Sequence, residues 1–448
     1  MNNYGGCTGQ LDLKSKFTVT YKHVTEELWE NYHFVGNTGR VTVFTTRPYS
    51  EAFTTQRLDH TDFPLYTAQK ADYEPLLYCG FCNLFDRYLQ RLLPDAPEQL
   101  LKSRPAHKPP LQIWLLFRTR GAADAAKEHI NEAIAEKLDI QNFSSSNTFR
   151  VTDLGCSVGP NTILAMQNIV DAVELKYQSQ GHNTPEFQVF FNDHASNDFN
   201  TLFTSLPPHR KYYAAAVPGS FYSRLFPNAS LHFVFSSYAL QCLSQVPKEV
   251  LDKSSPAWNK GRIHYSNASD KVVQSYAAQY AKDMECFLNA RAQEVVYGGF
   301  IVIIIPGRPN GLPHSQAIAN MVGEILGSCL LDMAKKGTIS EEKVDTFNLP
   351  TYFASPQEVE AIVERNGCFR LERMEILPQA IPSGNFSRGK VTSSQIRAGM
   401  EGMFKEHFGE EIIDELFDAL HKKLDESSIF ESGNGSTLFA LLNRIATV

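Results

Sequence analysis

A strand that runs into a glycine turn limits most narrowly how this chain can fold. Residues 151–162 read VTDLGCSVGPNT, and in this stretch Asp153 precedes Gly155 and Gly159. Pro160 then opens a long amphipathic run, as proline does at the first position of a helix. Glycines between a strand and a helix allow a ligand to approach the backbone closely. The pattern therefore predicts a strand, a ligand-binding turn and a helix in succession.

Apolar runs alternate with stretches of helical periodicity over the rest of the chain. The runs that predict strands are FRVTDLGC, FQVFFNDH, SLHFVFSSYAL and GGFIVIIIPG, and segments 369–377 and 436–445 can close the edge of the sheet. Such alternation is typical of an α/β fold of the Rossmann-like type, with a mostly parallel sheet and helices on both faces. Helical insertions at about 314–336 and 391–427 are too long to be connectors, and we expect them to form a cap.

Composition excludes several classes of partner. The chain has 448 residues and a formal net charge of −7, and it has no long basic block, so we expect no nucleic acid. Its most apolar run, FIVIIIP at 300–306, is too short to span a bilayer, so we expect no membrane partner. The eight cysteines are scattered and the start does not resemble a signal peptide, which predicts reduced thiols in the cytoplasm.

The acid before the turn indicates what kind of ligand it holds. The first glycine of the dinucleotide fingerprint GxGxxG is missing, and a carboxylate at Asp153 would repel pyrophosphate. It suits a ligand with a positive charge and no phosphate, and S-adenosylmethionine is such a ligand. Asp193 ends the next strand, where a carboxylate can accept both ribose hydroxyls. The alternative is a tight strand–helix turn with a solvated carboxylate.

Longer motifs make a family resemblance specific. They are DLGCSVGPNT at 153–162, FFNDHASNDFNTLFTSLP at 190–207, VPGSFYSRLFP at 217–227, SSYALQCLSQVP at 236–247, WNKGRIHYS at 258–266 and VDTFNLP at 344–350. In order and spacing over 121–445 the chain resembles the plant SABATH family of S-adenosylmethionine-dependent methyltransferases, and TPEFQVFFNDH and NKGRIHY resemble its loganate-methylating subgroup. The resemblance implies a class I methyltransferase fold with a helical substrate-binding cap, a small carboxylic acid as substrate and a homodimer.

The resemblance also implies site residues. Cofactor contacts fall on Asp153, Gly155, Cys156, Asn161, Asp193, His194, Ser220 and Phe221, where the last two flank the adenine. Substrate contacts fall on Tyr238, Gln241 and Cys242. A magnesium site, present in some relatives, falls on Asn259, Asp345, Phe347 by its carbonyl, and Asn348, and oxygen ligands suit that ion. Core packing, helix capping and an Asn/Asp turn network are the structural alternatives for these residues.

Two substrate positions leave the type of reaction open. Gln241 stands where carboxyl methyltransferases of the family often have His and where caffeine-type enzymes have Gln. Cys242 replaces a Trp that packs on the bound acid, so a large apolar wall is missing. We expect methyl ester formation on a small apolar acid of the terpenoid or iridoid type, which needs no general base because such an acid is already ionised at neutral pH. N-methylation of a purine-like ring and a catalytically impaired family member are the alternatives.

The N-terminal quarter of the chain does not match the family. Members begin with a segment of the type YSxNSxxQ that leads directly into the first helix, whereas here WLLFRTR precedes Gly121. We therefore expect residues 1–119 to be foreign to the family and poorly packed. Residues 120–448 are expected to form the methyltransferase domain.

Overall fold

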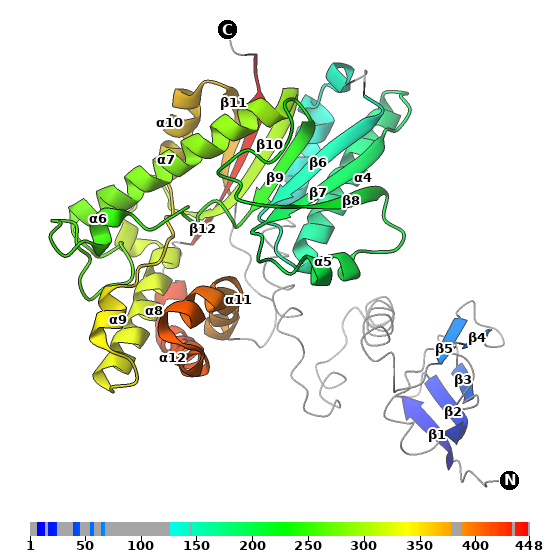
Figure 1. Cartoon of the computed structure of the whole chain (residues 1–448). Coiled ribbons are helices and arrows are strands. Elements are labelled where there is room, and N and C mark those ends of the chain that lie inside the picture. Colours follow the sequence, from blue (N-terminus) through cyan, green and yellow to red (C-terminus); the bar gives the residue numbers. More distant parts are fainter. Residues whose placement is uncertain are drawn as a thin grey trace. The chain divides into compact units, whose positions relative to one another are not determined.

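The chain divides into two units, Met1–His107 and Lys108–Val448. The computed structural model describes residues 126–143, 146–377, 387–431 and 435–446, together with the backbones of five strands in the first unit (Figure 1). In that first unit, β1 (Cys7–Leu13) pairs antiparallel with β2 (Phe17–Val24), which pairs parallel with β3 (Gly39–Phe44). Strand β4 (Thr54–Arg57) pairs antiparallel with β5 (Pro64–Thr67). The expected poor packing of residues 1–119 lies outside the described side chains.

A seven-stranded sheet forms the centre of the second unit, in the order β11-β12-β10-β9-β6-β7-β8 (Figure 1). The strands are β6 (Thr148–Leu154), β7 (Glu186–Asp193), β8 (Tyr212–Pro218), β9 (Leu231–Ser237), β10 (Val295–Gly307), β11 (Phe369–Leu377) and β12 (Ser436–Arg444). Only β12 runs antiparallel to its neighbours, so the sheet is mostly parallel, as expected. Strand β8 was not predicted, because YYAAAVP is alanine-rich and half-exposed at the sheet edge.

Helices cover both faces of this sheet, which confirms the predicted class. Side chains of a strand alternate between faces, and in β10 the even-numbered residues Phe300, Val302 and Ile304 enter one core while the odd-numbered Ile301 and Ile303 enter the other. The first core includes α4 (Pro160–Ser179) and a helix over 126–137. The second includes α7 (Asp270–Glu294) and α10 (Pro356–Asn366).

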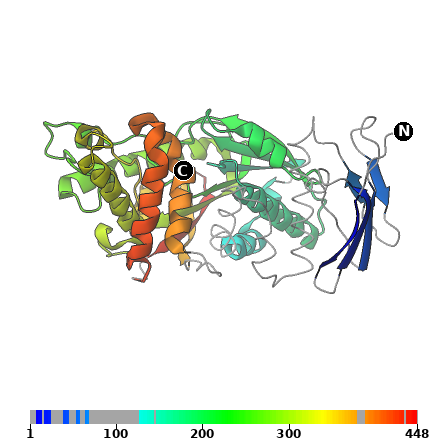
Figure 2. The ribbon, with the colours of Figure 1, turned by 90° about the horizontal axis from the view of Figure 1, so that it is seen from below.

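A third apolar core lies among helices inserted between the last strands. It is built from α8 (Ile318–Lys335), α9 (Glu341–Asp345), α11 (Arg388–Phe408) and α12 (Ile413–Glu426). Helices α11 and α12 lie side by side (Figure 2). The remaining short helices are η2 (Ile140–Phe143), α5 (Phe199–Ser205), α6 (Lys248–Leu251), η3 (His314–Gln316), η4 (Glu410–Ile412) and η5 (Ile429–Glu431). No helix in the described residues has both the length and the apolar character needed to cross a membrane.

Candidate active site

The candidate site lies where the strand order reverses. Strand β6 pairs with β7 on one side and with β9 on the other, and all three run parallel. In open α/β sheets, ligands bind outside the carboxyl ends of the strands at such a switch point. Asp153 lies at the carboxyl end of β6 and Asp193 at that of β7, and Tyr238 directly follows β9. The fold therefore brings three separate motifs of the sequence to one edge.

Gly155 begins the turn after β6 and can only be a glycine. Its φ is +85°, and a Cβ built on it would lie 2.3 Å from the Cβ of Ala239. The amides of Gly155 and Cys156 both donate to the carbonyl of Asn192, each at 2.9 Å. The turn is thus pressed against the segment after β9 and bonded to the end of β7.

Asp193 fixes the next part of the turn. Its Oδ2 accepts a hydrogen bond from the Ser157 amide at 2.7 Å, and its Oδ1 accepts one from the His194 amide at 2.7 Å. Ser157 has φ +53°, and its carbonyl accepts a bond from Asn197 Nδ2 at 3.2 Å. A non-glycine residue in this region of φ costs energy and often marks a functional site. The half-exposed carboxylate is therefore held in place by backbone donors.

Asp153 differs from Asp193 in its surroundings. It is 3% exposed, and its Oδ2 accepts a hydrogen bond from the Thr162 hydroxyl in the first turn of α4. Burial, opposed by the Thr162 hydrogen bond and assisted by the charge of Asp193, raises the pKa of Asp153 to about 7. Its carboxyl is satisfied within the protein and carries only part of a charge at neutral pH.

Three more predicted cofactor residues surround this turn. Cys156 is buried, its Sγ donates to the Ser157 carbonyl, and burial raises the pKa of its thiol. Asn161 is half-buried in the first turn of α4. His194 is exposed directly after Asp193. These three residues therefore lie in or close to the turn that follows β6.

The segment after β8 supplies Ser220 and Phe221. Ser220 is exposed, and its Oγ accepts a hydrogen bond from the Tyr222 amide at 3.3 Å. Phe221 is buried, and its Cε1 would lie 3.7 Å from a Cβ at Gly155, so the ring packs against the glycine turn. An edge-on contact with Phe287 of α7, at 6.4 Å between centroids, supports the other side of the ring. The structure therefore brings this segment next to the turn, as the prediction requires.

The predicted substrate residues begin with Tyr238. Its φ is +55°, and its amide donates to the Ile304 carbonyl at 2.7 Å. Its hydroxyl lies 2.9 Å from Thr437 Oγ1 at the start of β12. This unusual backbone turns the chain away from β9 at the same sheet edge as the glycine turn.

Gln241 and Cys242 follow on the same segment. Gln241 Nε2 donates to the Tyr238 carbonyl at 2.7 Å, while its Oε1 is buried with no hydrogen-bond partner among the described residues. The Cys242 carbonyl accepts a hydrogen bond from the Tyr222 hydroxyl at 2.5 Å. Burial, with a smaller contribution from the Asp193 charge, raises the pKa of the Cys242 thiol to about 11. The segment therefore offers a hydroxyl, an amide and a protonated thiol.

Of the four predicted magnesium ligands, only Asn259 and Asn348 are joined to each other by a hydrogen bond between their side chains. Asn259 Nδ2 donates to Asn348 Oδ1 at 2.7 Å, and Asp345 Oδ1 accepts from the Gly261 amide at 2.7 Å. Asn259 Oδ1 is buried and has no partner in the described part of the chain. Phe347 is buried between Asp345 and Asn348. The unsatisfied Asn259 oxygen suits a cation that prefers oxygen ligands, whereas the Asn348 Nδ2, also buried without a partner among the described residues, does not. No group of three His, Cys, Asp or Glu side chains suited to a metal occurs among the described residues.

The sequence did not point to Asn192, which joins three strand ends. Besides the two amides that its carbonyl accepts, its side chain donates to the carbonyls of Val217 at 2.7 Å and Gly219 at 2.9 Å. It is fully buried. A polar residue at the end of an otherwise apolar strand is the signal that could have revealed this role.

The arrangement fits S-adenosylmethionine better than a dinucleotide. The turn leaves open space at Gly159, where nothing lies within 4 Å of a built Cβ, has a buried acid behind it at Asp153, and presents a carboxylate at Asp193. A sulfonium and a ribose are compatible with acids, whereas a pyrophosphate is not.

Comparison with known proteins agrees with this assignment. The family model described as "SAM dependent carboxyl methyltransferase" matches residues 118–445. Loganic acid O-methyltransferase of Catharanthus roseus is 52% identical over 312 residues, which cover 69% of this chain and 84% of that protein. Farnesoic acid carboxyl-O-methyltransferase of Arabidopsis thaliana is 43% identical over 303 residues, covering 67% of this chain and 86% of that protein.

A solved structure leads to the same family. The structure described as "Loganic acid methyltransferase with SAH" is 49% identical, has a TM-score of 0.71, and covers 74% of this chain and 95% of that one. The seven-stranded sheet, the site at its switch point and these similarities agree with one another. The chain therefore belongs to the SAM dependent carboxyl methyltransferase family, the SABATH family, and S-adenosylmethionine is its cofactor.

Proposed function

We propose that the acid methylated by this chain is small and apolar, of the terpenoid or iridoid type, and that the product is its methyl ester. The observation that carries the proposal is the set of neutral donors on the segment after β9, which suits a carboxylate and supplies no base. Two relatives are named for loganic acid and for farnesoic acid, and both names are those of carboxylic acids.

The chain's own residues then bind and orient the acid. The Tyr238 hydroxyl, next to Thr437, and the Gln241 amide are the donors for its carboxylate. S-adenosylmethionine supplies an electrophilic methyl group on sulfur. Because the acid is ionised near neutral pH, the reaction needs alignment and exclusion of water rather than proton removal.

The state of the nearby thiol supports a reaction without a protein nucleophile. The pKa of Cys242 is raised to about 11, so its thiol stays protonated at neutral pH. The pKa of the neighbouring Tyr222 hydroxyl is also raised by burial. Methylation of a ring nitrogen that carries a hydrogen would need a proton acceptor, and neither group can act as one.

We assign the cofactor roles as follows. Asp193 accepts the ribose hydroxyls, Ser220 and Phe221 flank the adenine, and Asp153 with the Gly155 turn faces the positively charged end. Cys156, Asn161 and His194 line the pocket. The support is their common position around the switch point, described above.

We also infer a magnesium ion at Asn259, Asp345, Phe347 and Asn348. The unsatisfied Asn259 Oδ1 supports it. Thermal unfolding with and without MgCl2 tests the site, because an ion that binds the native state raises the melting temperature. The same measurement on Asp345→Asn should show a smaller rise, and equal rises would contradict the assignment.

We further propose a domain organisation and an oligomeric state for the chain. Residues 1–119 are a segment foreign to the family, the helices in 314–336 and 391–427 cap the substrate, and the chain forms a homodimer. Replacing residues 1–119 by a family-type YSQNSSYQ leader should raise turnover if the N-terminal contacts are missing. Unchanged turnover would contradict the first of these proposals.

A panel of substrates tests the proposed reaction. Purified protein is incubated with S-adenosylmethionine and, separately, loganic acid, farnesoic acid, a benzoic acid and xanthines, and methyl esters and N-methyl products are measured by mass spectrometry. Methyl esters of apolar acids support the proposal. N-methylxanthines alone would replace it by ring N-methylation, and cofactor binding without any product would indicate an impaired enzyme.

A further inference from the structure

Two oppositely charged residues near the end of α7 are completely buried. Arg291 and Glu294 are both 0% exposed, and Arg291 Nε donates to Glu294 Oε2 at 2.7 Å. They lie on the same face of the helix as Phe287, whose ring is 5.2 Å from the Arg291 guanidinium carbon. Full burial of a charged pair is unusual, because both side chains lose their hydration.

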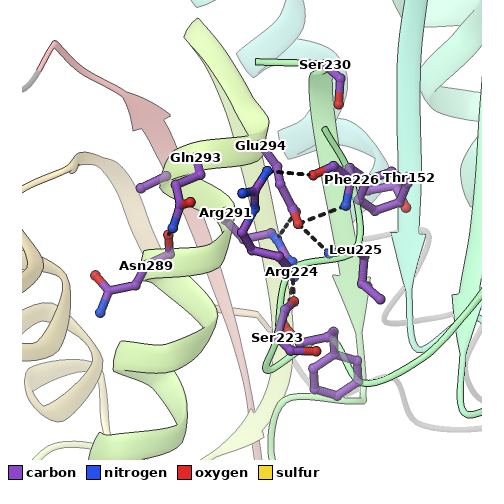
Figure 3. Close-up of polar contacts among 12 residues, drawn as sticks. Thr152, Ser223, Arg224, Leu225, Phe226, Ser230, Asn289, Arg291, Gln293 and Glu294 are labelled. Atoms are coloured by element: carbon purple, nitrogen blue, oxygen red, sulfur yellow. Dashed lines mark hydrogen bonds and ion pairs between the residues drawn. The ribbon is translucent and has the colours of Figure 1, made fainter. Parts of the chain in front are cut away.

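The remaining hydrogen bonds of the two side chains go to one segment, residues 221–226 (Figure 3). Arg291 Nη1 donates to the Phe221 carbonyl at 2.8 Å, and Nη2 donates to the Ser223 carbonyl at 2.9 Å. Glu294 Oε1 accepts hydrogen bonds from the amides of Leu225, at 2.5 Å, and Phe226, at 3.0 Å. The pair therefore satisfies four backbone groups of a segment that has no regular secondary structure.

The same end of α7 also holds the segment through its backbone. The amides of Ala229 and Ser230 donate to the carbonyls of Gln293 and Glu294, each at 2.8 Å. Helix α7 thus holds segment 221–226 through two side chains and the residues that follow it through two carbonyls. Ser220 is exposed and directly precedes this segment, and its carbonyl accepts hydrogen bonds from the amide and the hydroxyl of Ser223, at 3.1 and 2.9 Å.

Stability alone does not explain such a pair. Well-packed apolar residues often stabilise a core as well as a buried ion pair does. A buried pair can instead specify one conformation, and here that conformation places the Phe221 ring against Gly155. A site binds more tightly when its contacts are fixed before the ligand arrives.

We propose that Arg291 and Glu294 are positioning residues that preorganise segment 220–226 for the adenine of S-adenosylmethionine. The proposal rests on the contacts proposed above for Ser220 and Phe221. It assigns a cofactor-affinity role to a helix that contributes no predicted cofactor contact. Loss of the pair should weaken cofactor binding and leave turnover at saturating cofactor largely unchanged.

The test is calorimetric titration with S-adenosylmethionine. The double variant Arg291→Met/Glu294→Leu removes both charges together, so that no unpaired charge remains buried. We expect its Kd to rise at least tenfold, with kcat on the best acid of the panel within twofold. Arg291→Lys should give a smaller rise, because its ammonium keeps the charge opposite Glu294 but cannot replace the forked donation to two carbonyls.

A matched control lies on the same helix. Glu285 pairs with Arg365 of α10 at 2.6 Å in an exposed position, and no hydrogen bond or ion pair among the described residues joins this pair to segment 220–226. Glu285→Met/Arg365→Met should leave the Kd within twofold of the native value. A native-like Kd in the folded Arg291→Met/Glu294→Leu variant would overturn the proposal. If that variant does not fold, a native-like Kd in Arg291→Lys overturns it instead.

Phe221→Ala separates this proposal from the adenine assignment. If Phe221→Ala alone leaves the Kd unchanged, the adenine contact fails and the positioning role fails with it. If Phe221→Ala weakens binding, adding it to the double variant should have little further effect, because both act through one segment. If the rises in Kd caused by Phe221→Ala and by the double variant multiply in the combined variant, the positioning role is overturned and the adenine contact still holds.

Discussion

The cofactor side and the substrate side of this site share one sheet edge but are built differently. Around Gly155 and Asp193, adjacent strand ends bond directly to one another through backbone groups. Around Gln241, the contacts join the segment after β9 to an inserted segment, since its carbonyl accepts a hydrogen bond from the Tyr352 amide at 2.9 Å. Its side-chain nitrogen donates locally to the Tyr238 carbonyl, and its side-chain oxygen has no partner among the described residues. A cofactor site made from strand ends tolerates little change, whereas a substrate site made from inserted segments can change its specificity without disturbing the sheet.

The largest expected effect is that of Gly155→Ala on the cofactor side. The φ of +85° and the 2.3 Å approach to Ala239 combine backbone strain with overlap, together worth about 2–6 kcal/mol. We expect loss of measurable S-adenosylmethionine binding in calorimetry and a marked fall in the melting temperature. Gly181→Ala is the control, because its φ is +72° but nothing lies within 4 Å of its Cβ. Equal behaviour of the two variants would show that the close approach is unimportant.

Asp153 should make stability depend on pH. Its pKa is raised from 3.8 to about 7, so the native state holds this proton more tightly than the unfolded chain does. The free energy of unfolding should therefore fall as pH rises from about 4 to about 7, by on the order of 4 kcal/mol from this group. Asp153→Asn keeps an acceptor for Thr162 and removes this term, so urea unfolding at pH 5 and pH 8 should differ less than in the native chain. Parallel pH profiles would contradict the buried-acid description.

Asp193→Ala should weaken the binding of the cofactor without unfolding the sheet. Hydrogen bonds to a charged acceptor contribute about 1.5–3 kcal/mol, so the Kd for S-adenosylmethionine should rise by roughly tenfold or more. Asp198→Ala is the matched control, because Asp198 caps α5 through the Thr201 amide and is exposed. Equal calorimetric Kd values for the native chain and Asp193→Ala would show that Asp193 does not bind the cofactor.

The smallest expected effect is on the substrate side. Cys242→Trp adds an aromatic wall worth about 0.5–1.5 kcal/mol, so KM for cyclic acids should fall by roughly two- to tenfold while the cofactor Kd stays constant. Cys286→Trp on the exposed surface of α7 should change neither. If Cys242→Trp shifts the cofactor Kd as strongly as KM, the two sides are not separate.

The sequence predicted the two strands, the glycine turn and the helix of the cofactor side because their signals are local. A glycine after an acid at a strand end, and a second acid at the next strand end, follow from strand periodicity and turn chemistry. The comparisons confirmed the family and the fold, and the roles of the individual site residues remain predictions. Asn192 was not recognised, because its four hydrogen-bond partners depend on which strands are neighbours.

The buried ion pair of α7 shows what could not be predicted from the sequence alone. Arg291 and Glu294 occur in a helix rich in charges, where most such residues are solvated. Their burial depends on the register in which α7 packs on the sheet, which periodicity alone does not fix. Strand β8 was missed for a related reason, since an edge strand with alternating exposure gives a weak apolar signal.

The central claim is that the cofactor side is complete on its own. Calorimetric titration of the native chain with S-adenosylmethionine, in the absence of any acid, tests this most directly. We expect saturable binding with one site per chain, and tenfold or greater weakening in Asp193→Ala. Absence of binding to a folded native chain, or binding only after an acid is added, would contradict it.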